Sequence, residues 1–241
     1  MKTRLHTFLA EKNDLVMHDT LNPVIWENDR LKPELKSAML RIADTFIEFL
    51  GADKTHLNDI VFTGSNVGYM YHDKSDIDLH FIFDFDAECK TCGGIPLEDC
   101  MLAKKSLWND EHDVSIKGYQ VEVYAEMAEK LVTSAGVYSI LHDSWVQHPT
   151  RDQIDVNDPL IIQKAKELRA MVDAAVDGKV DELDSLDEIS TRIRNMRTAG
   201  LSSAGEYSIE NLAFKLLRND GTIEKLKNYK RSLEDSKLSV E

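Results

Sequence analysis

In residues 77–83 the apolar Ile77, Leu79, Phe81 and Phe83 alternate with Asp78, His80 and Ile82. This period of two is typical of a strand that packs one face on a core and leaves the other face polar. A second short apolar run, residues 60–62, stops at Thr63-Gly64-Ser65. Because these strands must bury one face of a sheet, an all-helical architecture is excluded.

Helical spacing of apolar residues precedes these strands. It begins at Pro33, which suits a first helical turn, and Gly51 is positioned to end the helix. Residues 96–108 predict another helix. Residues 114–116 and 119–124 predict a hairpin that turns at Lys117-Gly118.

The chain after Pro149 has helical periodicity throughout. Residues 161–176, 186–196 and 209–217 each form one apolar helical face, and Gly200 is expected to end the second helix. We therefore expect an α/β (α+β) fold, with a small mixed or antiparallel sheet flanked by helices and a helical domain behind it. The expected domains are residues 1–150 and residues 151–241.

Composition narrows the class of protein. The 241 residues carry a net charge of −14, and 42% of them are hydrophobic. An acidic chain gains little from counterion release, so non-specific binding to duplex DNA is not expected. No apolar run approaches the roughly 20 residues of a membrane span, and three cysteines fit a reducing compartment. We expect a cytoplasmic protein with no membrane contact.

Two aspartates, Asp76 and Asp78, stand two residues apart and would project from one face of the strand. Side-by-side carboxylates repel unless a cation neutralises them, and magnesium prefers carboxylate oxygens. Glu122, a lone acid between two valines, would join them if its strand pairs beside residues 77–83. The sequence thus predicts a site for two Mg²⁺ ions at Asp76, Asp78 and Glu122.

Gly64 and Ser65 stand where a strand turns toward a short helix, so their backbone N–H groups would suit a phosphate. The alternative is a solvated face, since Asp-x-Asp arises by chance in a chain with 43 acids. The ordered set of strand, Gly-Ser, Asp-x-Asp and valine-flanked acid favours the functional interpretation.

These residues carry a resemblance to a known family. Gly64-Ser65, Asp76-Ile77-Asp78 and Glu122 resemble the signature of the DNA polymerase beta-type nucleotidyltransferase superfamily, over about residues 59–124. Longer pieces, among them residues 136–140 and 205–212, are similar to predicted nucleotidyltransferases of tailed bacteriophages. The resemblance implies that residues 1–150 are the catalytic domain and that a helical domain closes over the nucleotide. It also implies that both aspartates hold both metals and that the third acid activates the attacking hydroxyl.

Positive charge is concentrated near the C-terminus. Residues 191–231 hold nine basic and four acidic side chains, a net charge of +5. Asn211, Lys215 and Arg218 follow helical spacing and are expected to form one polar stripe that binds the triphosphate. A solvated helix face is the alternative.

Aromatic and histidine side chains offer further candidates. Tyr138 and Trp145 could stack on a base, although core packing is the more frequent role of such residues. His80 shares a strand face with Asp78, where it either orients a ligand or packs.

All three cysteines fall between residues 86 and 112. Cys89 and Cys92 form a C-x2-C pair, and Cys100 and His112 could complete a loose zinc pattern. A surface loop with reduced thiols is the favoured interpretation, and a zinc site stays an alternative.

The combined expectation is a magnesium-dependent enzyme that moves a nucleoside monophosphate from a nucleoside triphosphate such as ATP to a hydroxyl, releasing pyrophosphate. The acceptor could be an RNA end, a protein or a small molecule, and a short single-stranded RNA end or a tRNA would suit the basic helices. If a phage encodes the chain, the compartment is the host cytoplasm. The alternatives are a nucleotide-binding or interaction protein that keeps the fold without turnover, and a zinc-binding module.

Overall fold

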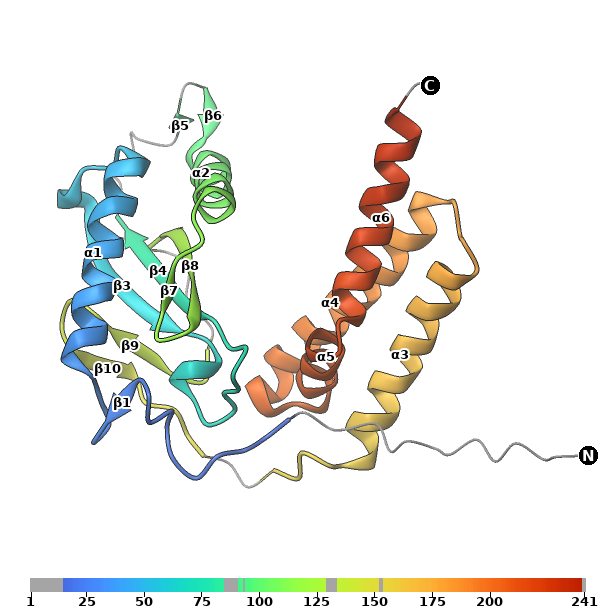
Figure 1. The fold of residues 1–241 in the computed structure, drawn as a ribbon, viewed down its shortest axis with the longest axis horizontal. Coiled ribbons are helices and arrows are strands. Elements are labelled where there is room, and N and C mark those ends of the chain that lie inside the picture. Colours follow the sequence, from blue (N-terminus) through green and yellow to red (C-terminus); the bar gives the residue numbers. More distant parts are fainter. Residues whose placement is uncertain (1–14, 85–90, 93, 129–133, 152–153, 240–241) are drawn as a thin grey trace, which may run out of the picture. The chain divides into compact units, whose positions relative to one another are not determined.

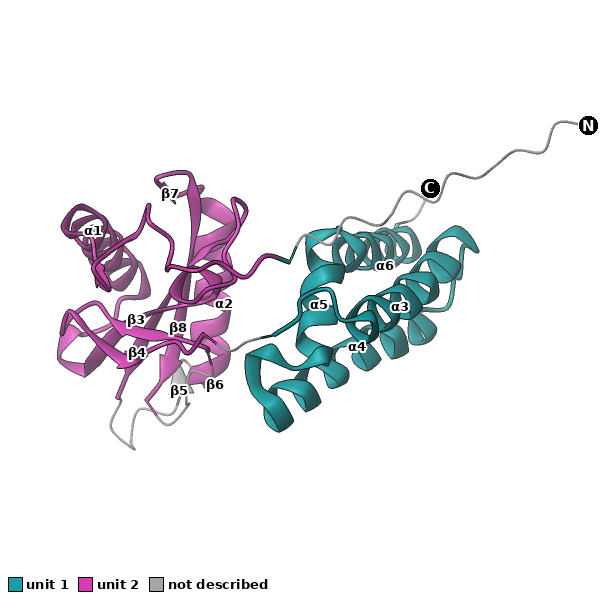
Figure 2. Cartoon of the chain, turned by 90° about the horizontal axis from the view of Figure 1, so that it is seen from below, with its two compact units in different colours: residues 1–15, 153–241 teal, residues 16–152 magenta. Residues whose placement is uncertain are grey.

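The computed structural model describes residues 15–84, 91–92, 94–128, 134–151 and 154–239. The chain divides into two compact units, one spanning residues 16–152 and one that contains residues 153–241 (Figure 2). In the described ranges no helix is both long enough and apolar enough to cross a membrane.

The first unit is built on a six-stranded mixed sheet (Figure 1). All neighbouring strands in it pair antiparallel except β4 and β8, which run parallel. This arrangement, with helices against the sheet and further helices toward the C-terminus, confirms the expected α+β class. In spatial order the strands are β10 (Ser144–Gln147), β9 (Val137–Ser139), β3 (Leu57–Thr63), β4 (Ile77–Phe83), β8 (Tyr119–Met127) and β7 (Ser115–Ile116).

Alternation along β4 decides which face is buried. Ile77 and every second residue up to Phe83 are fully buried, while the residues between them are only partly covered. Helices α1 (Pro33–Leu50) and α2 (Leu97–Glu111) pack on the buried face. Phe46 of α1 lies 4.8 Å from Phe81 and 5.4 Å from Trp108 of α2, measured between ring centroids. The opposite face of the sheet therefore carries the polar side chains.

The ends of these elements follow the predicted signals. Pro33 begins α1, and Gly51 ends it in the left-handed conformation, with φ of 66°. Lys117 and Gly118 both have positive φ, as the two-residue turn between β7 and β8 requires. Small two-stranded pairs, not predicted, are formed by β1 (Trp26–Glu27) with β2 (Arg30–Leu31) and by β5 (Thr91–Cys92) with β6 (Ile95–Pro96).

The second unit is helical. It contains α3 (Pro159–Asp177), α4 (Leu183–Ala204), α5 (Ile209–Asn219) and α6 (Thr222–Leu238). Ser208 caps α5, accepting a hydrogen bond from the N–H of Asn211 at 3.3 Å. The sequence analysis missed α6 because that helix buries little: Thr222 and Leu226 are its buried residues.

The expectation that the second helix ends at Gly200 is wrong, because α4 continues to Ala204. Gly200 is buried where the start of α5 crosses it. A Cβ at this position would lie 2.5 Å from Cβ of Glu210 and 2.6 Å from Oγ of Ser208. The glycine is present because two helices approach closely there, and it does not break the helix.

This contact predicts the effect of Gly200→Ala. In an exposed helix interior the change would stabilise by about 1 kcal/mol. Here the added methyl meets α5, so we expect the free energy of unfolding to fall by about 1–3 kcal/mol. Urea denaturation measures it, with the exposed Ser202→Ala on the same helix as the control. A stabilised Gly200→Ala variant would contradict the contact.

Candidate active site

The parallel pairing of β4 with β8 brings two of the predicted acids together. Asp78 and Glu122 are register partners on neighbouring strands. Both stand on the polar face, since Ile77 and Val121 are buried on the other. Asp76 directly precedes β4, so it enters the sheet at the same end.

Gly64 lies against the Asp78 carboxylate. Its backbone is left-handed, with φ of 87°, and a Cβ there would fall 2.1 Å from Oδ2 of Asp78. The glycine was predicted to allow close approach of a ligand; the close approach seen in the structure is to the Asp78 carboxylate. The N–H of Gly64 donates to Oγ of Ser134 at 3.4 Å.

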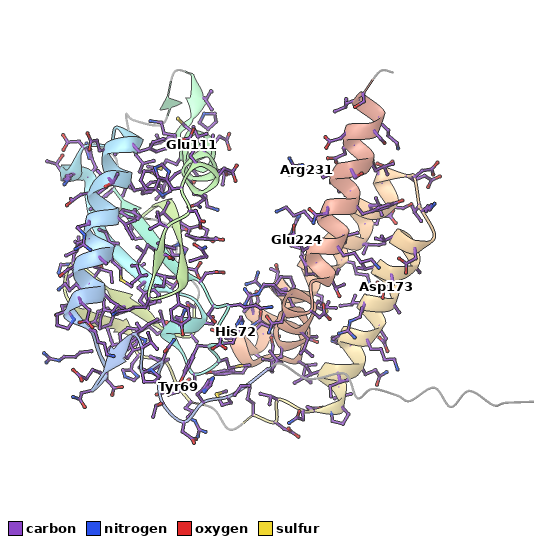
Figure 3. The ribbon with its side chains drawn as sticks, viewed as in Figure 1. Tyr69, His72, Glu111, Asp173, Glu224 and Arg231 are labelled. Atoms are coloured by element: carbon purple, nitrogen blue, oxygen red, sulfur yellow. The ribbon has the colours of Figure 1, made fainter. Side chains whose placement is uncertain are left out.

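Serine hydroxyls hold the loop between Gly64 and β4. Ser65, at the start of the short helix η2 (Ser65–Val67), donates its hydroxyl to Oγ of Ser75 at 2.7 Å. Oγ of Ser75 also accepts from the N–H of His72 at 3.0 Å. Tyr69 and His72 mark this loop in Figure 3. The buried Ser75 thus ties the predicted phosphate turn to the residue next to Asp76.

A buried amide network, missed by the sequence analysis, fixes the backbone of Asp76. The side chain of Asn66 donates to the carbonyl of Asp76 at 2.9 Å and accepts from Asn22 at 2.8 Å. The indole of Trp26 donates to the carbonyl of Asn66 at 2.7 Å. Asn22 and Asn66 are fully buried. Single asparagines carry no spacing signal, so their role could not be found from the sequence.

Tyr124 is the second feature that the sequence analysis missed. Its hydroxyl donates to Oε2 of Glu122 at 2.5 Å. Burial raises the pKa of Tyr124 above its ordinary value, and the hydrogen bond to Glu122 and the charges of Asp78, Glu122 and Asp76 raise that pKa further. All three predicted acids therefore act on one hydroxyl group, which stays protonated at neutral pH.

His80 packs against side chains of β8. Its ring stacks on Tyr124, its register partner, with centroids 4.5 Å apart and planes 7° apart. Its Nδ1 lies 3.0 Å from Oε1 of Glu126. Lys105 of α2 places its ammonium 4.2 Å from the centroid of the Tyr124 ring.

The chemistry of the acids fits magnesium, because carboxylate oxygens are the hard ligands that this ion takes. Among the described residues, however, no three His, Cys, Asp or Glu side chains are placed as a ready metal site.

The cysteine pattern gains no support from the described residues. Cys89 lies outside them, Cys92 belongs to β5, and Cys100 is a half-buried cysteine of α2 that forms no disulfide with a described residue. The ring of His112 stacks on Trp108 at 3.8 Å. A zinc site stays a prediction.

Tyr138 and Trp145 are core aromatics. Tyr138 is fully buried, and its ring meets Trp145 edge-on at 5.1 Å. Trp145 stacks on Trp26 at 4.7 Å. Packing against neighbouring rings accounts for both.

Asn211, Lys215 and Arg218 belong to the helical unit. Two of them are largely covered and contact Glu206 within that unit, and the triphosphate role predicted for all three stays a prediction. Asn211 is 2% exposed and donates to the carbonyl of Glu206 at 2.7 Å. Lys215 forms an ion pair with Glu206 at 2.5 Å, and the two side chains are only 12% and 18% exposed. Arg218 is exposed, and its role toward a triphosphate stays a prediction.

Much of the C-terminal positive charge is neutralised within the helical unit. Lys225 pairs with Asp173 at 2.7 Å and Asp177 at 3.1 Å. Lys230 pairs with Asp187 at 2.5 Å. Figure 3 shows Asp173 on α3 and Glu224 and Arg231 on α6. Five basic side chains of residues 191–231 are exposed and have no described ion pair: Arg192, Arg194, Arg218, Lys227 and Arg231.

No family model matches the sequence, and no curated protein matches it. Among solved structures, the chain is similar to the STING-associated CdnE c-di-GMP synthase from Capnocytophaga granulosa. The identity is 12% and the TM-score 0.22, over 89% of this chain and 90% of that chain. A TM-score this low establishes neither a shared fold nor a shared activity, so the chemistry has to be inferred from the side chains themselves.

The contact between Gly64 and Asp78 predicts that Gly64→Ala displaces the Asp78 carboxylate. Gly118→Ala is a matched control, because Gly118 has a φ of 89° and open space where its Cβ would stand. Both changes strain a left-handed residue by about 1–2 kcal/mol. Only the first should move Asp78, which crystal structures of both variants would show. An unmoved Asp78 in Gly64→Ala would contradict the contact.

The largely buried ion pair predicts that Lys215→Ala is destabilising, because it removes a short charge-assisted contact of the Glu206 carboxylate. We expect a loss of about 1–3 kcal/mol in the free energy of unfolding. Arg218→Ala, an exposed cation of the same helix, should change it by less than about 0.5 kcal/mol. Urea denaturation of both variants measures the difference, and equal values would show that Lys215 is an ordinary surface residue.

Proposed function

We propose that this protein is a magnesium-dependent nucleotidyltransferase that moves a nucleoside monophosphate from ATP or another nucleoside triphosphate to a hydroxyl acceptor. The observation that carries the proposal is the register of β4 and β8, which pairs Asp78 with Glu122 on the polar face of the sheet. Asp76 directly precedes β4, two residues before Asp78. Two acids on one sheet face, with a third just before the strand and a glycine against the Asp78 carboxylate, suit phosphoryl transfer better than they suit a structural role.

In this proposal Asp76 and Asp78 would hold two magnesium ions, and Glu122 would be the third ligand of one of them. The bound ions would lower the pKa of the acceptor hydroxyl and neutralise the phosphates. Glu122 would accept the hydroxyl proton as the acceptor oxygen bonds to the α-phosphorus and the bond to pyrophosphate breaks. The backbone at Gly64 and Ser65 would face the phosphates.

The acceptor is proposed only by class. An RNA end, a protein hydroxyl or a small molecule would each supply the attacking oxygen. The exposed cations of the helical unit favour a short single-stranded RNA end or a tRNA over a long duplex, since the chain as a whole carries −14.

A non-catalytic nucleotide-binding protein is the second candidate. One observation favours it: the described residues contain no closed group of three metal-binding side chains. Such a protein would bind labelled ATP without releasing pyrophosphate.

The proposal predicts that Asp76→Asn, Asp78→Asn and Glu122→Gln each reduce nucleotide transfer by more than about 100-fold, since removing partners outside the metal's own ligands already costs 10- to 100-fold. The fold should survive, because each change removes one of several repelling charges. Transfer is measured with labelled nucleoside triphosphate and magnesium.

Asp110→Asn is the matched control. Asp110 is an exposed acid of α2 in the same unit, and its removal should leave transfer unchanged. Wild-type turnover in Asp78→Asn would overturn the metal assignment. Binding of labelled ATP by the wild type, with no turnover across a panel of hydroxyl acceptors, would favour the second candidate.

A further inference from the structure

Tyr124 makes a short, well-defined contact to an acid of the proposed metal site. Its hydroxyl donates to Oε2 of Glu122 at 2.5 Å, from the same face of β8 two residues along. We infer that Tyr124 is a positioning residue, which fixes the Glu122 carboxylate so that Oε1 is the oxygen available to a divalent cation. This inference rests on the proposed function.

The ring of Tyr124 is held from both sides. His80 stacks on one face at 4.5 Å, and the ammonium of Lys105 lies 4.2 Å from the ring centroid. His80 comes from β4, which pairs with β8, and Lys105 comes from α2, whose Asn109 bonds to the backbone of Val123 at the other edge of β8, so the two groups clamp the phenol from two sides. The clamp limits sideways movement of the ring and therefore fixes the position of the hydroxyl oxygen.

His80, one of the two groups of the clamp, is itself held by a brace, its contact with Glu126. Nδ1 of His80 lies 3.0 Å from Oε1 of Glu126, the next residue along the polar face of β8. Three neighbouring side chains of β8, at positions 122, 124 and 126, are thereby joined to His80 of β4. A surface tyrosine would not need such a chain of contacts, but a hydroxyl that orients a ligand carboxylate does.

Orientation has a chemical consequence at this position. Asp78 and Glu122 are register partners, so their charges repel across the parallel pair. A hydrogen bond to Oε2 withdraws charge from that oxygen and turns the carboxylate into one defined geometry. The cation would then meet a preset ligand and would not have to order a free side chain.

The test is Tyr124→Phe, which keeps the ring and its stacking and removes only the hydroxyl. Its readout is the affinity for Mn²⁺ without nucleotide, measured by titration calorimetry on the full chain. We expect binding to weaken by about 10- to 100-fold, the usual effect of removing a partner of a metal ligand. Tyr229→Phe is the matched control, because it removes a hydroxyl that donates to the carbonyl of Val180 at 3.0 Å in the helical unit.

Two further variants separate positioning from simple damage. In a Glu122→Gln background, Tyr124→Phe should cause no additional loss, because the hydroxyl acts through Glu122. Glu126→Gln keeps every buried aromatic and weakens only the brace, so it should reduce Mn²⁺ affinity by less than Tyr124→Phe does. This variant also tests the inference if Tyr124→Phe does not fold.

The possible results distinguish this inference from the proposed function. If the wild type binds Mn²⁺ and Asp78→Asn does not, the metal site stands; unchanged affinity in Tyr124→Phe would then overturn the positioning role alone. If the wild type and Asp78→Asn bind Mn²⁺ equally, the metal site itself is wrong, and the positioning role falls with it. Equal losses in Tyr124→Phe and Tyr229→Phe would show a general loss of stability and overturn the role of Tyr124.

Discussion

The site depends on the register between the parallel strands β4 and β8. Side chains alternate with a period of two, so a slip of one residue would turn every side chain of one strand to the other face. A slip of β4 would take Ile77 out of the core and put Asp78 into it, and a slip of β8 would do the same to Val121 and Glu122. Burying apolar side chains stabilises the sheet by about 25 cal/mol for each Å² removed from water, so the core excludes the slip. The positions of Asp78 and Glu122 are therefore set by the buried apolar residues on the other face of the sheet.

The core supplies this geometry at an electrostatic cost. It places like charges side by side, and nothing apolar offsets their repulsion. The structure contains three local responses: Tyr124 donates to Glu122, Asn66 holds the backbone of Asp76, and Gly64 makes room for Asp78. Local rules of stability are broken most often at functional sites, and this is one reason to propose a site at the acids of this sheet.

The sequence predicted those features of the fold that depend on residues close to one another along the chain. Strand alternation, the left-handed glycine that ends α1 and the hairpin at Lys117-Gly118 were all found, because each is a local property. Contacts made by folding were not. Gly200 was interpreted as a helix stop although it is a packing position, and Asn22 and Asn66 gave no signal at all. The hydrogen bond between Tyr124 and Glu122 could have been predicted from the sequence, since positions two apart on a strand share a face.

The charge of the C-terminal segment was also misjudged from the sequence, because its ion pairs join residues that are far apart along the chain. A net charge of +5 over residues 191–231 suggests a surface for an anion, but that sum omits the acids of α3 and of early α4. Asp173, Asp177 and Asp187 lie outside the segment in sequence and pair with its lysines in the folded unit. Such ion pairs hold the helices together, and they leave little net positive charge to attract a distant anionic partner. An anionic acceptor that docks on residues 191–231 would meet mainly the exposed Arg192, Arg194, Arg218, Arg231 and Lys227, which suits a short contact with a nucleic acid end better than a long basic surface.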